Sequence, residues 1–243
     1  MAYIFTVDQF IEKLKFAASK KTLYIKGCFG APMNATNKKR YTTNLQYNKN
    51  RANIINAATA DTFGFDCNCL IKGILWGWSA DQYKNYGGAT YKSNGVPDFG
   101  ADNTLDYCTN VSTDFNNIVP GEVVWMPGHV GVYIGNGQVI ECTPKWTNNV
   151  QYSYLANIGY KTGNYRTWNR HGKLQWINYN VVSAPAEQPV TKPVSNSVYH
   201  VVQKGDSLYK IGKKYGISWT VIAKNNGIKA PWIIHPGQNL KIK

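Results

Sequence analysis

Apolar residues recur with helical spacing in two stretches of the N-terminal part of the chain. In the first, residues 7–19, they return every three or four positions, and Thr6 and Gln9 have the spacing of a capping box at its start. The second stretch follows Asp66, a residue type that caps helix N-termini well. Its apolar stripe consists of Leu70, Ile71, Ile74, Leu75 and Trp78. The pattern predicts two amphipathic helices, the second packed into the core with its first turn facing a cleft.

The segments around these two helices are more polar. Residues 24–30 are aromatic and interrupted by glycine, which predicts a loop that approaches another group closely, or an ordinary connection between helices. Residues 34–64 contain one modest helical patch at 51–60, and residues 81–117 have the composition of a loop. Loops this long in a compact domain are usually functional, so we expect them to form the walls of a groove.

Short runs rich in Val, Ile and aromatic residues follow in the second half of the chain. The runs at 122–126, 129–134 and 138–142 are separated by glycine-containing turns, which predicts successive antiparallel strands. Two or three more strands are expected between residues 150 and 179. This order of elements indicates an α+β domain over residues 1–181, with N-terminal helices packed on an antiparallel β-sheet.

The composition changes at residues 182–197, where prolines recur among small and polar residues. This stretch predicts an extended tether of about 3 Å per residue, so we place a domain boundary here. Residues 198–243 contain strand-like ends around two helical patches, which predicts a small β-α-α-β domain. This segment carries eight lysines and one acidic residue, Asp206, and therefore holds half of the formal net charge of +14.

The overall composition is that of a globular protein. Hydrophobic residues make up 43% of the 243 positions and aromatic residues 14%, which is enough for a core without crosslinks. The five cysteines are an odd number in a chain this large, so we expect free thiols rather than a disulfide framework. No apolar run reaches the length of about 18 residues that a membrane span needs, and the N-terminus lacks the pattern of a secretory signal.

The excess of 27 Lys and Arg over 13 Asp and Glu predicts a polyanionic partner. Nucleic acid is the default candidate. However, the charge is not gathered in one basic helix, and no helix-turn-helix, RRM or zinc signature accompanies it. An anionic cell envelope satisfies the same electrostatics.

Cys67 is the candidate nucleophile, because a thiol in the first turn of a helix is exposed to the positive end of the helix dipole. This position is expected to lower its pKa from the reference value of about 8.5. Taken alone, a cysteine here is more often a small buried apolar residue. The candidate bases are His129 and His171, because the other two histidines belong to the small basic domain. His129 begins a strand, where its side chain can be held at the edge of a cleft.

The hairpin at 135–137 permits a geometric test. If all three residues form the loop, Gly131 faces Glu141, and His129 and Glu141 become diagonal neighbours with Gly131 leaving room between them. Glu141 could then orient the imidazole and stabilise its protonated form. If only Asn136 and Gly137 form the turn, the register shifts and Cys142 replaces Glu141 on that face. The residues themselves do not decide between the two.

Three sequence blocks together resemble the NlpC-type papain-like cell-wall peptidases. They are Phe65-Asp66-Cys67 with Leu70, then Pro120-Gly121-Glu122-Val123-Val124-Trp125-Met126, and Gly128-His129-Val130-Gly131-Val132-Tyr133-Ile134-Gly135-Asn136-Gly137. The resemblance covers most of residues 1–180 and implies a papain-like fold.

This resemblance implies that Cys67 is the nucleophile, His129 the general base and Glu141 the third polar residue, which favours the three-residue loop. It also implies that Tyr24 lines the site and helps to bind the oxyanion. We further expect Asp66 to contact substrate.

The chain departs from the family pattern after the nucleophile, where Asn68 and Cys69 replace the usual small residues, and at the third position, where Glu replaces the more common His, Asn or Gln. Cys69 is two residues beyond Cys67 and should point about 200° away around the helix, so we expect only Cys67 to face the cleft.

The C-terminal segment resembles a LysM module, through Tyr199-His200-Val201-Val202-Gln203-Lys204-Gly205-Asp206-Ser207-Leu208, Asn226-Gly227-Ile228 and Pro236-Gly237-Gln238-Asn239-Leu240. Such modules hold N-acetylglucosamine chains in a shallow groove. The residues implied in this groove are Gly205, Asp206, Ser207, Leu208, Asn226, Ile228 and Ile234. Packing within a tiny domain is the alternative role for each.

The sequence therefore predicts a peptidoglycan hydrolase that cuts an amide bond of the stem peptide by thiol attack and is targeted by a LysM module. No metal or cofactor is expected, because the cysteines and His129 lack a zinc-like spacing. The partner expected is peptidoglycan rather than nucleic acid or a membrane. With no signal peptide, we expect synthesis in a host cytoplasm and action at the bacterial wall, as for a phage endolysin.

Three alternatives remain at this point. They are an N-acetylmuramoyl-L-alanine amidase of the same fold, a non-catalytic wall-binding protein, and a nucleic-acid binder that acts through charge alone.

Overall fold

The computed structural model describes residues 3–180, 198–203, 205–229 and 232–242. Internal contacts divide the chain into two units, Met1–Tyr179 and Asn180–Lys243, and each is described by itself. The predicted proline-rich tether, residues 182–197, lies outside the described residues. The fold is mixed α/β.

Helix α1 (Val7–Ala18) forms where the helical period and the capping box predict it. The Thr6 hydroxyl accepts a hydrogen bond from the Gln9 amide, and the Gln9 side chain accepts one from the Thr6 amide, so two backbone groups at the helix start are satisfied. The short strand β1 (Phe5–Thr6) pairs in parallel with β12 (Ile177–Asn178) and joins the start of this unit to its end.

The main sheet has seven strands in the order β10-β9-β8-β7-β6-β11-β5. Their bounds are β5 Cys108–Ser112, β6 Val123–Met126, β7 His129–Gly135, β8 Gln138–Thr143, β9 Asn149–Leu155, β10 Tyr165–Arg166 and β11 Arg170–Leu174. Strands β6 to β9 are successive and antiparallel, which confirms the prediction for this stretch. Strand β10 instead runs parallel to β9.

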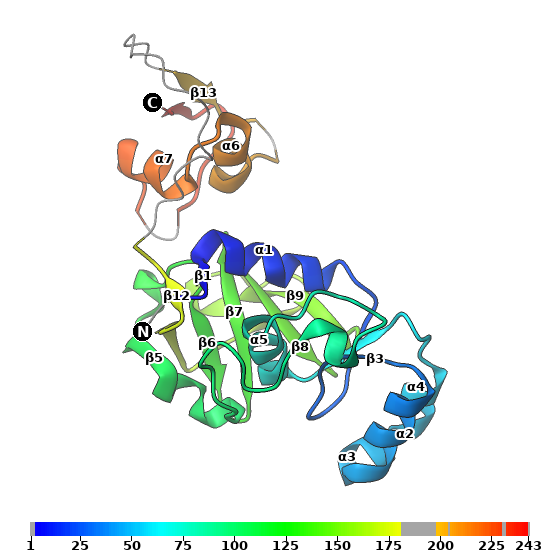
Figure 1. Ribbon diagram of the computed structural model, residues 1–243. Helices are drawn as coiled ribbons and strands as arrows, with labels where there is room; N and C mark the ends of the chain where they lie inside the picture. Colours follow the sequence, from blue (N-terminus) through cyan, green and yellow to red (C-terminus); the bar gives the residue numbers. More distant parts are fainter. Residues whose placement is uncertain (1–2, 181–197, 204, 230–231, 243) are drawn as a thin grey trace. The chain divides into compact units, whose positions relative to one another are not determined.

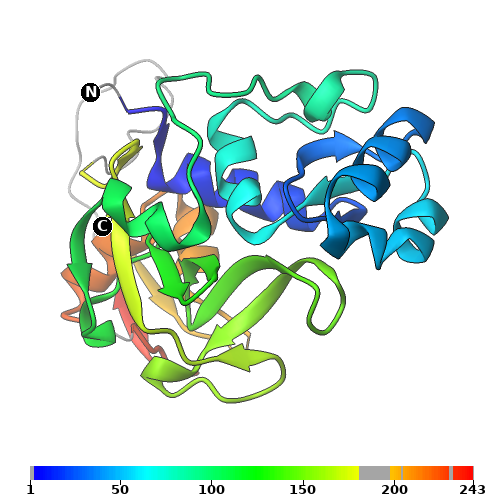
Figure 2. The same ribbon diagram turned by 90° about the horizontal axis from the view of Figure 1, so that it is seen from below.

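Helix α5 (Cys67–Leu75) is the central helix of the first unit, and all nine of its residues are buried. It contacts β7 and β8, and Figures 1 and 2 show it lying against the sheet with α1 nearby. The five predicted stripe residues are at most 1% exposed. Trp78 is one of them, although the helix itself ends at Leu75. The amphipathic pattern therefore identified the core face correctly.

A second, three-stranded sheet was not predicted. It has the order β2-β4-β3, formed by β2 (Thr22–Tyr24), β4 (Phe63–Phe65) and β3 (Phe29–Pro32). The expected loop at residues 24–30 is therefore a loop only in its middle. The strands are three or four residues long, too short to show an alternating pattern.

The polar stretch 34–64 contains one helix within the expected patch at 51–60, which confirms that prediction, and two helices that its pattern did not suggest. Helices α2 (Ala35–Asn44), α3 (Gln46–Lys49) and α4 (Ala52–Ala57) stand together at one side of the unit (Figures 1 and 2). Helix α2 buries only Asn37 and Tyr41. A helix with so little apolar surface has no hydrophobic period to detect, which explains the missed prediction.

Residues 81–117, expected to be loop, contain three short 3-10 helices and strand β5. The 3-10 helices are η1 (Asn85–Gly88), η2 (Ala101–Tyr107) and η3 (Phe115–Asn117). Strand β5 lies at the edge of the main sheet and has no buried residue, so it carries no alternation of buried and exposed positions. One more 3-10 helix, η4 (Ala156–Ile158), follows β9.

The second unit has the predicted β-α-α-β order. It consists of β13 (Tyr199–Val201), α6 (Leu208–Tyr215), α7 (Trp219–Asn225) and β14 (Asn239–Lys241), with the two strands antiparallel. Its small core contains Val202, Leu208, Ile211, Ile222 and Leu240. All five cysteines are free, as expected. Within the described residues, no helix has the length and apolarity needed to cross a bilayer.

A buried ion pair joins His171 of β11 to Glu122, the residue that precedes β6. The Nδ1 atom of His171 donates to Glu122 at 2.5 Å and its Nε2 atom donates to the Asp114 carbonyl at 3.0 Å, so both ring nitrogens carry protons. His171 and Glu122 are each 2% exposed. Burial lowers the pKa of His171, but the Glu122 hydrogen bond and the Asp114 carbonyl outweigh it and the net pKa is raised. His171, one of the two candidate bases, is therefore part of a structural ion pair.

We predict that the Glu122–His171 pair stabilises the fold most at acidic pH. Because the folded-state pKa of His171 is raised, its contribution is complete below about pH 6.5 and is lost as the pH rises through the folded-state value. Glu122→Gln should lower the free energy of unfolding by about 2 kcal/mol at pH 6, and by less at pH 9. Urea unfolding at the two pH values measures this.

The matched control is Asp61→Asn, which removes a carboxylate from the exposed pair with Lys21. It should leave the free energy of unfolding nearly unchanged at either pH, because solvent screens an exposed ion pair. An equal loss at pH 6 and pH 9 for Glu122→Gln would contradict the assignment of a charged His171.

Candidate active site

A pocket of about 560 Å³ surrounds the N-terminal end of α5. Residues from distant parts of the chain line it, among them Tyr24, Asp66, Cys67, Phe99 and Gly128. The long polar segments of the sequence contribute Tyr47 and Tyr91 to its walls, as expected for groove-forming loops. The cleft that the first turn of the second helix was predicted to face is therefore present.

Asp66 caps α5 and also ties a loop to it. One carboxylate oxygen accepts from the Cys69 amide at 2.6 Å and the other from the Gly27 amide at 2.7 Å. The predicted N-cap is thus confirmed. Since both oxygens are engaged by backbone, Asp66 fixes the position of the loop beside Cys67. Its predicted contact with substrate stays a prediction.

Cys67 lines the pocket and is 6% exposed. Burial raises the pKa of its thiol to about 12, and the neighbouring Asp66 charge adds to the effect. The backbone amides of Val130, Asn68 and Cys67 itself lower the pKa, but by less. The expectation that the helix start would lower this pKa was therefore wrong, because desolvation and the adjacent carboxylate outweigh the amides. Cys67 rests as a thiol and needs a base to become a nucleophile.

Cys69 lines the same pocket, contrary to the expectation that only one thiol would face it. The pocket continues around the helix to Lys72 and Trp76, which follow Cys69 by three and seven residues on the same helix face. The expectation was wrong because the pocket is wide enough to reach both residues. Burial and the Asp66 charge raise the pKa of the Cys69 thiol well above its usual value.

The histidine and the glutamate predicted to be neighbours are hydrogen bonded. Nε2 of His129 donates to Oε2 of Glu141 at 2.6 Å. The pairing of β7 with β8 places Val132 opposite Ile140, which sets Gly131 opposite Glu141 as the three-residue loop predicts. Nearer the tip, Gly135 pairs with Gln138 after a register shift. The hairpin therefore combines a two-residue turn with a bulge that restores the predicted register.

Gly131 leaves the room between His129 and Glu141 that the pattern suggested. A Cβ atom at this position would come within 3.3 Å of the Glu141 Cβ, 3.2 Å of the Trp168 ring and 2.7 Å of Val139. Any side chain here would push apart the groups that hold the dyad. The absence of a side chain is thus a packing requirement of the site.

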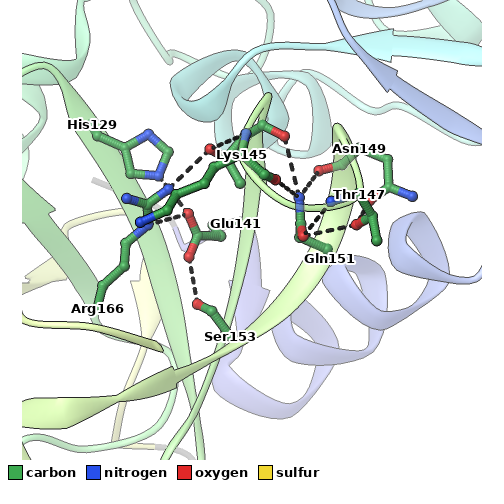
Figure 3. A network of polar contacts seen from close by, with 9 residues as sticks. His129, Glu141, Lys145, Thr147, Asn149, Gln151, Ser153 and Arg166 are labelled. Carbon is green, nitrogen blue, oxygen red and sulfur yellow. Dashed lines mark hydrogen bonds and ion pairs between the residues drawn. The ribbon is translucent and has the colours of Figure 1, made fainter. Parts of the chain in front are cut away.

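Glu141 has two further partners that the sequence did not reveal. The Arg166 guanidinium donates to it from Nε at 2.7 Å, and the Ser153 hydroxyl donates to its other oxygen (Figure 3). Glu141 is 0% exposed, and this burial raises its pKa. The hydrogen bond from His129 and the charges of His129 and Arg166 outweigh burial, so the net pKa is lowered and the carboxylate is ionised.

Helix α5, which begins at Cys67, contacts β7, the strand that begins at His129. The sulfur lies against the backbone amide of Val130, the residue after His129, and Gly128, the residue before it, lines the pocket. Because Nε2 of His129 is bonded to Glu141, Nδ1 is the ring nitrogen that remains, and it has no hydrogen-bond partner among the described residues. This nitrogen is available to take a proton.

Tyr24 is fixed at the pocket by its backbone. Its amide donates to the Asn148 carbonyl at 3.0 Å, and its carbonyl accepts from Arg51 at 2.8 Å. The ring packs edge-on against Tyr47 with centroids 6.1 Å apart. Burial and then the nearby Cys67 and Asp66 charges raise the pKa of Tyr24, so its hydroxyl stays protonated. That hydroxyl has no hydrogen-bond partner among the described residues.

The loop that carries Asn148 is held by the side chain of Gln151. Its amide donates to the carbonyls of Thr143, Lys145 and Asn149, and its oxygen accepts from Thr147 (Figure 3). Gln151 is 7% exposed. This buried amide therefore sets the turn between β8 and β9, and through Asn148 the position of Tyr24. Among the described residues, no group of three or more His, Cys, Asp or Glu is placed to hold a metal ion.

The residues proposed for glycan binding in the second unit make internal contacts. Asp206 accepts from His200 at 2.7 Å and from the Gln203 amide at 2.8 Å, Ser207 caps α6, and Leu208 is 1% exposed in the core. Asn226 bonds both backbone groups of Lys241 and so holds β14. The Gly205 position is exposed, and Ile228 and Ile234 are half-buried. Their role in glycan binding stays a prediction.

Comparison with known proteins identifies this second unit. Residues 200–243 match the family model of the LysM domain, so the C-terminal part of the chain is a LysM domain. LysM domains bind peptidoglycan and chitin-like glycans.

Several curated proteins share short stretches with this chain. "Spore coat assembly protein ExsA" of Bacillus cereus is 46% identical over 44 residues, which is 18% of this chain and 7% of that protein. "Lipoprotein NlpD/LppB homolog" of Pseudomonas aeruginosa is 41% identical over 59 residues, 24% of this chain and 19% of that protein. "SpoIVD-associated factor A" of Bacillus subtilis is 46% identical over 44 residues, 18% of this chain and 11% of that protein. The chain thus matches less than a fifth of the length of each relative.

We predict that the reactivity of Cys67 depends on His129. Since the pKa of the thiol by itself is about 12, a neutral pH supplies almost no thiolate unless the imidazole accepts the proton. His129→Ala should therefore slow alkylation of Cys67 by iodoacetamide at pH 7 by at least about tenfold. Peptide mapping by mass spectrometry separates Cys67 from the other four cysteines. An unchanged rate in the variant would show that the two side chains do not exchange a proton.

Proposed function

We propose that this protein is a peptidoglycan hydrolase with a papain-like catalytic domain of the NlpC type, which cleaves an amide bond in the stem peptide. The observation that carries the proposal is the His129–Glu141 pair, joined at 2.6 Å, on strands that contact the helix whose first residue, Cys67, is buried and lines a pocket. A thiol, an imidazole and an orienting carboxylate are the three groups that cysteine hydrolases use. The LysM domain supplies affinity for the same polymer.

The first step is the attack of Cys67 on the amide carbonyl carbon. Because the pKa of the thiol is raised, the proton leaves the sulfur as the new C–S bond forms, and Nδ1 of His129 receives it. The electron pair of the carbonyl double bond moves to the oxygen, which becomes an oxyanion. The buried carboxylate of Glu141 stabilises the imidazolium through Nε2.

The oxyanion needs donors that are already in place. The backbone amide of Cys67 belongs to the first turn of α5, where amides have no partner within the helix. The hydroxyl of Tyr24 is protonated and unengaged within the described residues, so it can serve as a second donor. Preorganised donors of this kind typically contribute a factor of about 100 or more to the rate.

The intermediate collapses when the imidazolium gives its proton to the leaving nitrogen. The C–N bond breaks, an amine departs, and a thioester joins the substrate to Cys67. Water activated by the neutral imidazole then hydrolyses the thioester and restores the thiol. The position of the cut within the peptidoglycan decides between an endopeptidase and an N-acetylmuramoyl-L-alanine amidase, because the two release different amines.

The LysM domain and the catalytic domain have separate tasks in this proposal. The LysM domain keeps the protein on the glycan, which raises the local concentration of stem peptides without altering the chemistry. Its segment, residues 198–243, also holds half of the net charge, which adds attraction to an anionic wall. Action at the bacterial cell wall follows from both properties.

We predict that Cys67→Ala abolishes the clearing of purified cell walls, whereas Cys69→Ala retains most of it. The pair is closely matched, because both thiols are buried on α5 and line the same pocket. Only Cys67 has its sulfur against the backbone of the strand that carries His129. Turbidity of a wall suspension measures the loss, and mass spectrometry of the digest identifies the new amine. If Cys69→Ala abolished the clearing and Cys67→Ala retained it, the nucleophile would be Cys69.

We also predict that the full-length Cys67→Ala variant still sediments with purified peptidoglycan. Binding through the LysM domain should persist at about 0.5 M NaCl, where exposed charges are strongly screened, and should be reduced by soluble N-acetylglucosamine oligomers. A protein that binds by charge alone would be released from peptidoglycan by the salt, and the oligomers would not reduce its binding. That outcome would favour the nucleic-acid alternative and remove the targeting role.

A further inference from the structure

Glu141 shares one oxygen between two cationic partners. Nε2 of His129 donates to Oε2 at 2.6 Å, and Nε of Arg166 donates to the same atom at 2.7 Å. The hydroxyl of Ser153 occupies the other oxygen. Figure 3 shows the three groups converging on the carboxylate from β7, β10 and β9. The carboxylate that orients the His129 imidazole therefore binds Arg166 as well.

Arg166 is held rigidly in this position. Its side chain is 14% exposed, its second end donates to the Thr143 hydroxyl at 2.9 Å, and its guanidinium lies over the Trp146 ring at 4.8 Å. A group with this many partners loses little freedom by binding Glu141.

The imidazole is fixed by the same set of residues. The Trp168 ring stacks on His129 with centroids 5.5 Å apart and lies 6.0 Å from the Arg166 guanidinium. Trp168 is anchored in turn, because Asn157 bonds both its amide and its carbonyl at 2.8 Å. Arg166, Trp168 and His129 thus pack as one unit around Glu141.

The shared oxygen has an electrostatic consequence. A buried carboxylate paired with an imidazole alone favours the protonated ring strongly, because little solvent screens the attraction. A base that holds its proton too tightly is a poor base at neutral pH, since it is already protonated before the reaction starts. A fixed positive charge on the same oxygen opposes this effect while keeping the carboxylate ionised.

We propose that Arg166 is a positioning residue of the dyad, which locks Glu141 in its ionised form and limits how tightly the Glu141–His129 pair holds a proton. This inference rests on the proposed function, because it assigns Arg166 a task in that reaction. Arg166 touches neither the pocket nor the sulfur, so it acts through Glu141.

The neighbouring titratable groups do not supply a substitute for this charge. Cys67, Asp66 and Tyr24 lie on the pocket side, and Cys142 follows Glu141 on β8. All of these are neutral or negative near pH 7. His129 and Arg166 are cations whose charges lower the pKa of Glu141. Lys145 is a further cation nearby, with its Nζ 4.9 Å from the Trp146 ring that also lies under Arg166, but it forms no ion pair with Glu141 among the described residues.

The test is the pH dependence of Cys67 alkylation and of wall hydrolysis in Arg166→Met. Loss of the guanidinium should leave the imidazole as the sole cationic partner of Glu141, so the acid limb of both profiles should move up by about one pH unit. Arg170→Met is the matched control, because Arg170 is an exposed arginine over the Trp125 ring at 5.2 Å and has no carboxylate contact among the described residues. Its profiles should coincide with those of the parent.

Further variants separate charge from packing. Arg166→Gln keeps an N–H donor and should give the same upward shift, which decides the question if Arg166→Met does not fold. Arg166→Lys retains the charge and should keep the limb within about 0.3 pH units of the parent. In a Glu141→Gln background, Arg166→Met should produce no upward shift, because the carboxylate through which it acts is gone.

Each outcome bears on one hypothesis. Acid limbs that stay fixed in both Arg166→Met and Arg166→Gln would overturn the inference and leave Arg166 a structural role. A shifted alkylation profile in a protein that does not cleave walls would support the role of Arg166 on His129 and reject the hydrolase. Cleavage with an unshifted profile would keep the hydrolase and reject the role of Arg166.

Discussion

The fold of the first unit depends on burying the N-terminal turn of α5 against the main sheet. This turn buries two thiols, and its capping carboxylate, Asp66, is half-buried beside them. Asp66 is tolerated because both of its oxygens accept backbone hydrogen bonds. Cys67 is tolerated because it remains a neutral thiol. In the proposed reaction, the same burial that places the sulfur beside the strand of His129 makes the thiol dependent on that histidine for activation.

The described residues contain three histidine–carboxylate pairs, and their surroundings give them different roles. The pair of His171 and Glu122 is sealed within the sheet, and its second ring nitrogen is used by a backbone carbonyl. In the LysM domain, His200 uses its second nitrogen for the Tyr215 hydroxyl at 3.0 Å. His129 alone among the three keeps a ring nitrogen without a described partner, next to a pocket. Pairing with a carboxylate is common to all three, and the free nitrogen is what makes one of them a candidate for catalysis.

The parts that the sequence predicted are those in which the information is local. The caps and apolar stripes of α1 and α5, the hairpin of β7 and β8, and the β-α-α-β order of the LysM domain are all encoded within a dozen or so neighbouring residues. The sequence left two alternatives for the hairpin register, a three-residue loop and a two-residue turn. The structure combines the two-residue turn with a bulge, so neither alternative alone describes it. Helix α2 was not predicted because it buries little apolar surface. The place of Cys69 in the pocket wall was not predicted because one helix alone does not determine the width of a pocket.

Arg166 illustrates what a pattern along the chain cannot supply. It reaches Glu141 because β10 pairs in parallel with β9, which places residue 166 beside a strand that in turn pairs with β8. Strand β10 is two residues long and has no alternation to detect. The nearest sequence signal is an arginine two residues before a tryptophan, which fits many surface strands equally well. The electrostatics of the candidate site thus depend on a long-range pairing, whereas its nucleophile and base lie in segments that the sequence reveals.

In the proposed function, the pocket orients the amide to be cleaved and the LysM domain binds the polymer, and there is a physical reason for this separation. The charged groups of the pocket are largely engaged within the protein, because Asp66 is bonded to backbone and Lys72 forms an ion pair with Asp98 and donates to the Phe99 carbonyl at 2.6 Å. Groups that are already satisfied gain little by exchanging their partners for those of a ligand. A pocket built this way is suited to orienting an amide rather than to binding a polymer tightly. In the proposed function, affinity for the wall then comes from the LysM domain, whose family binds peptidoglycan and chitin-like glycans.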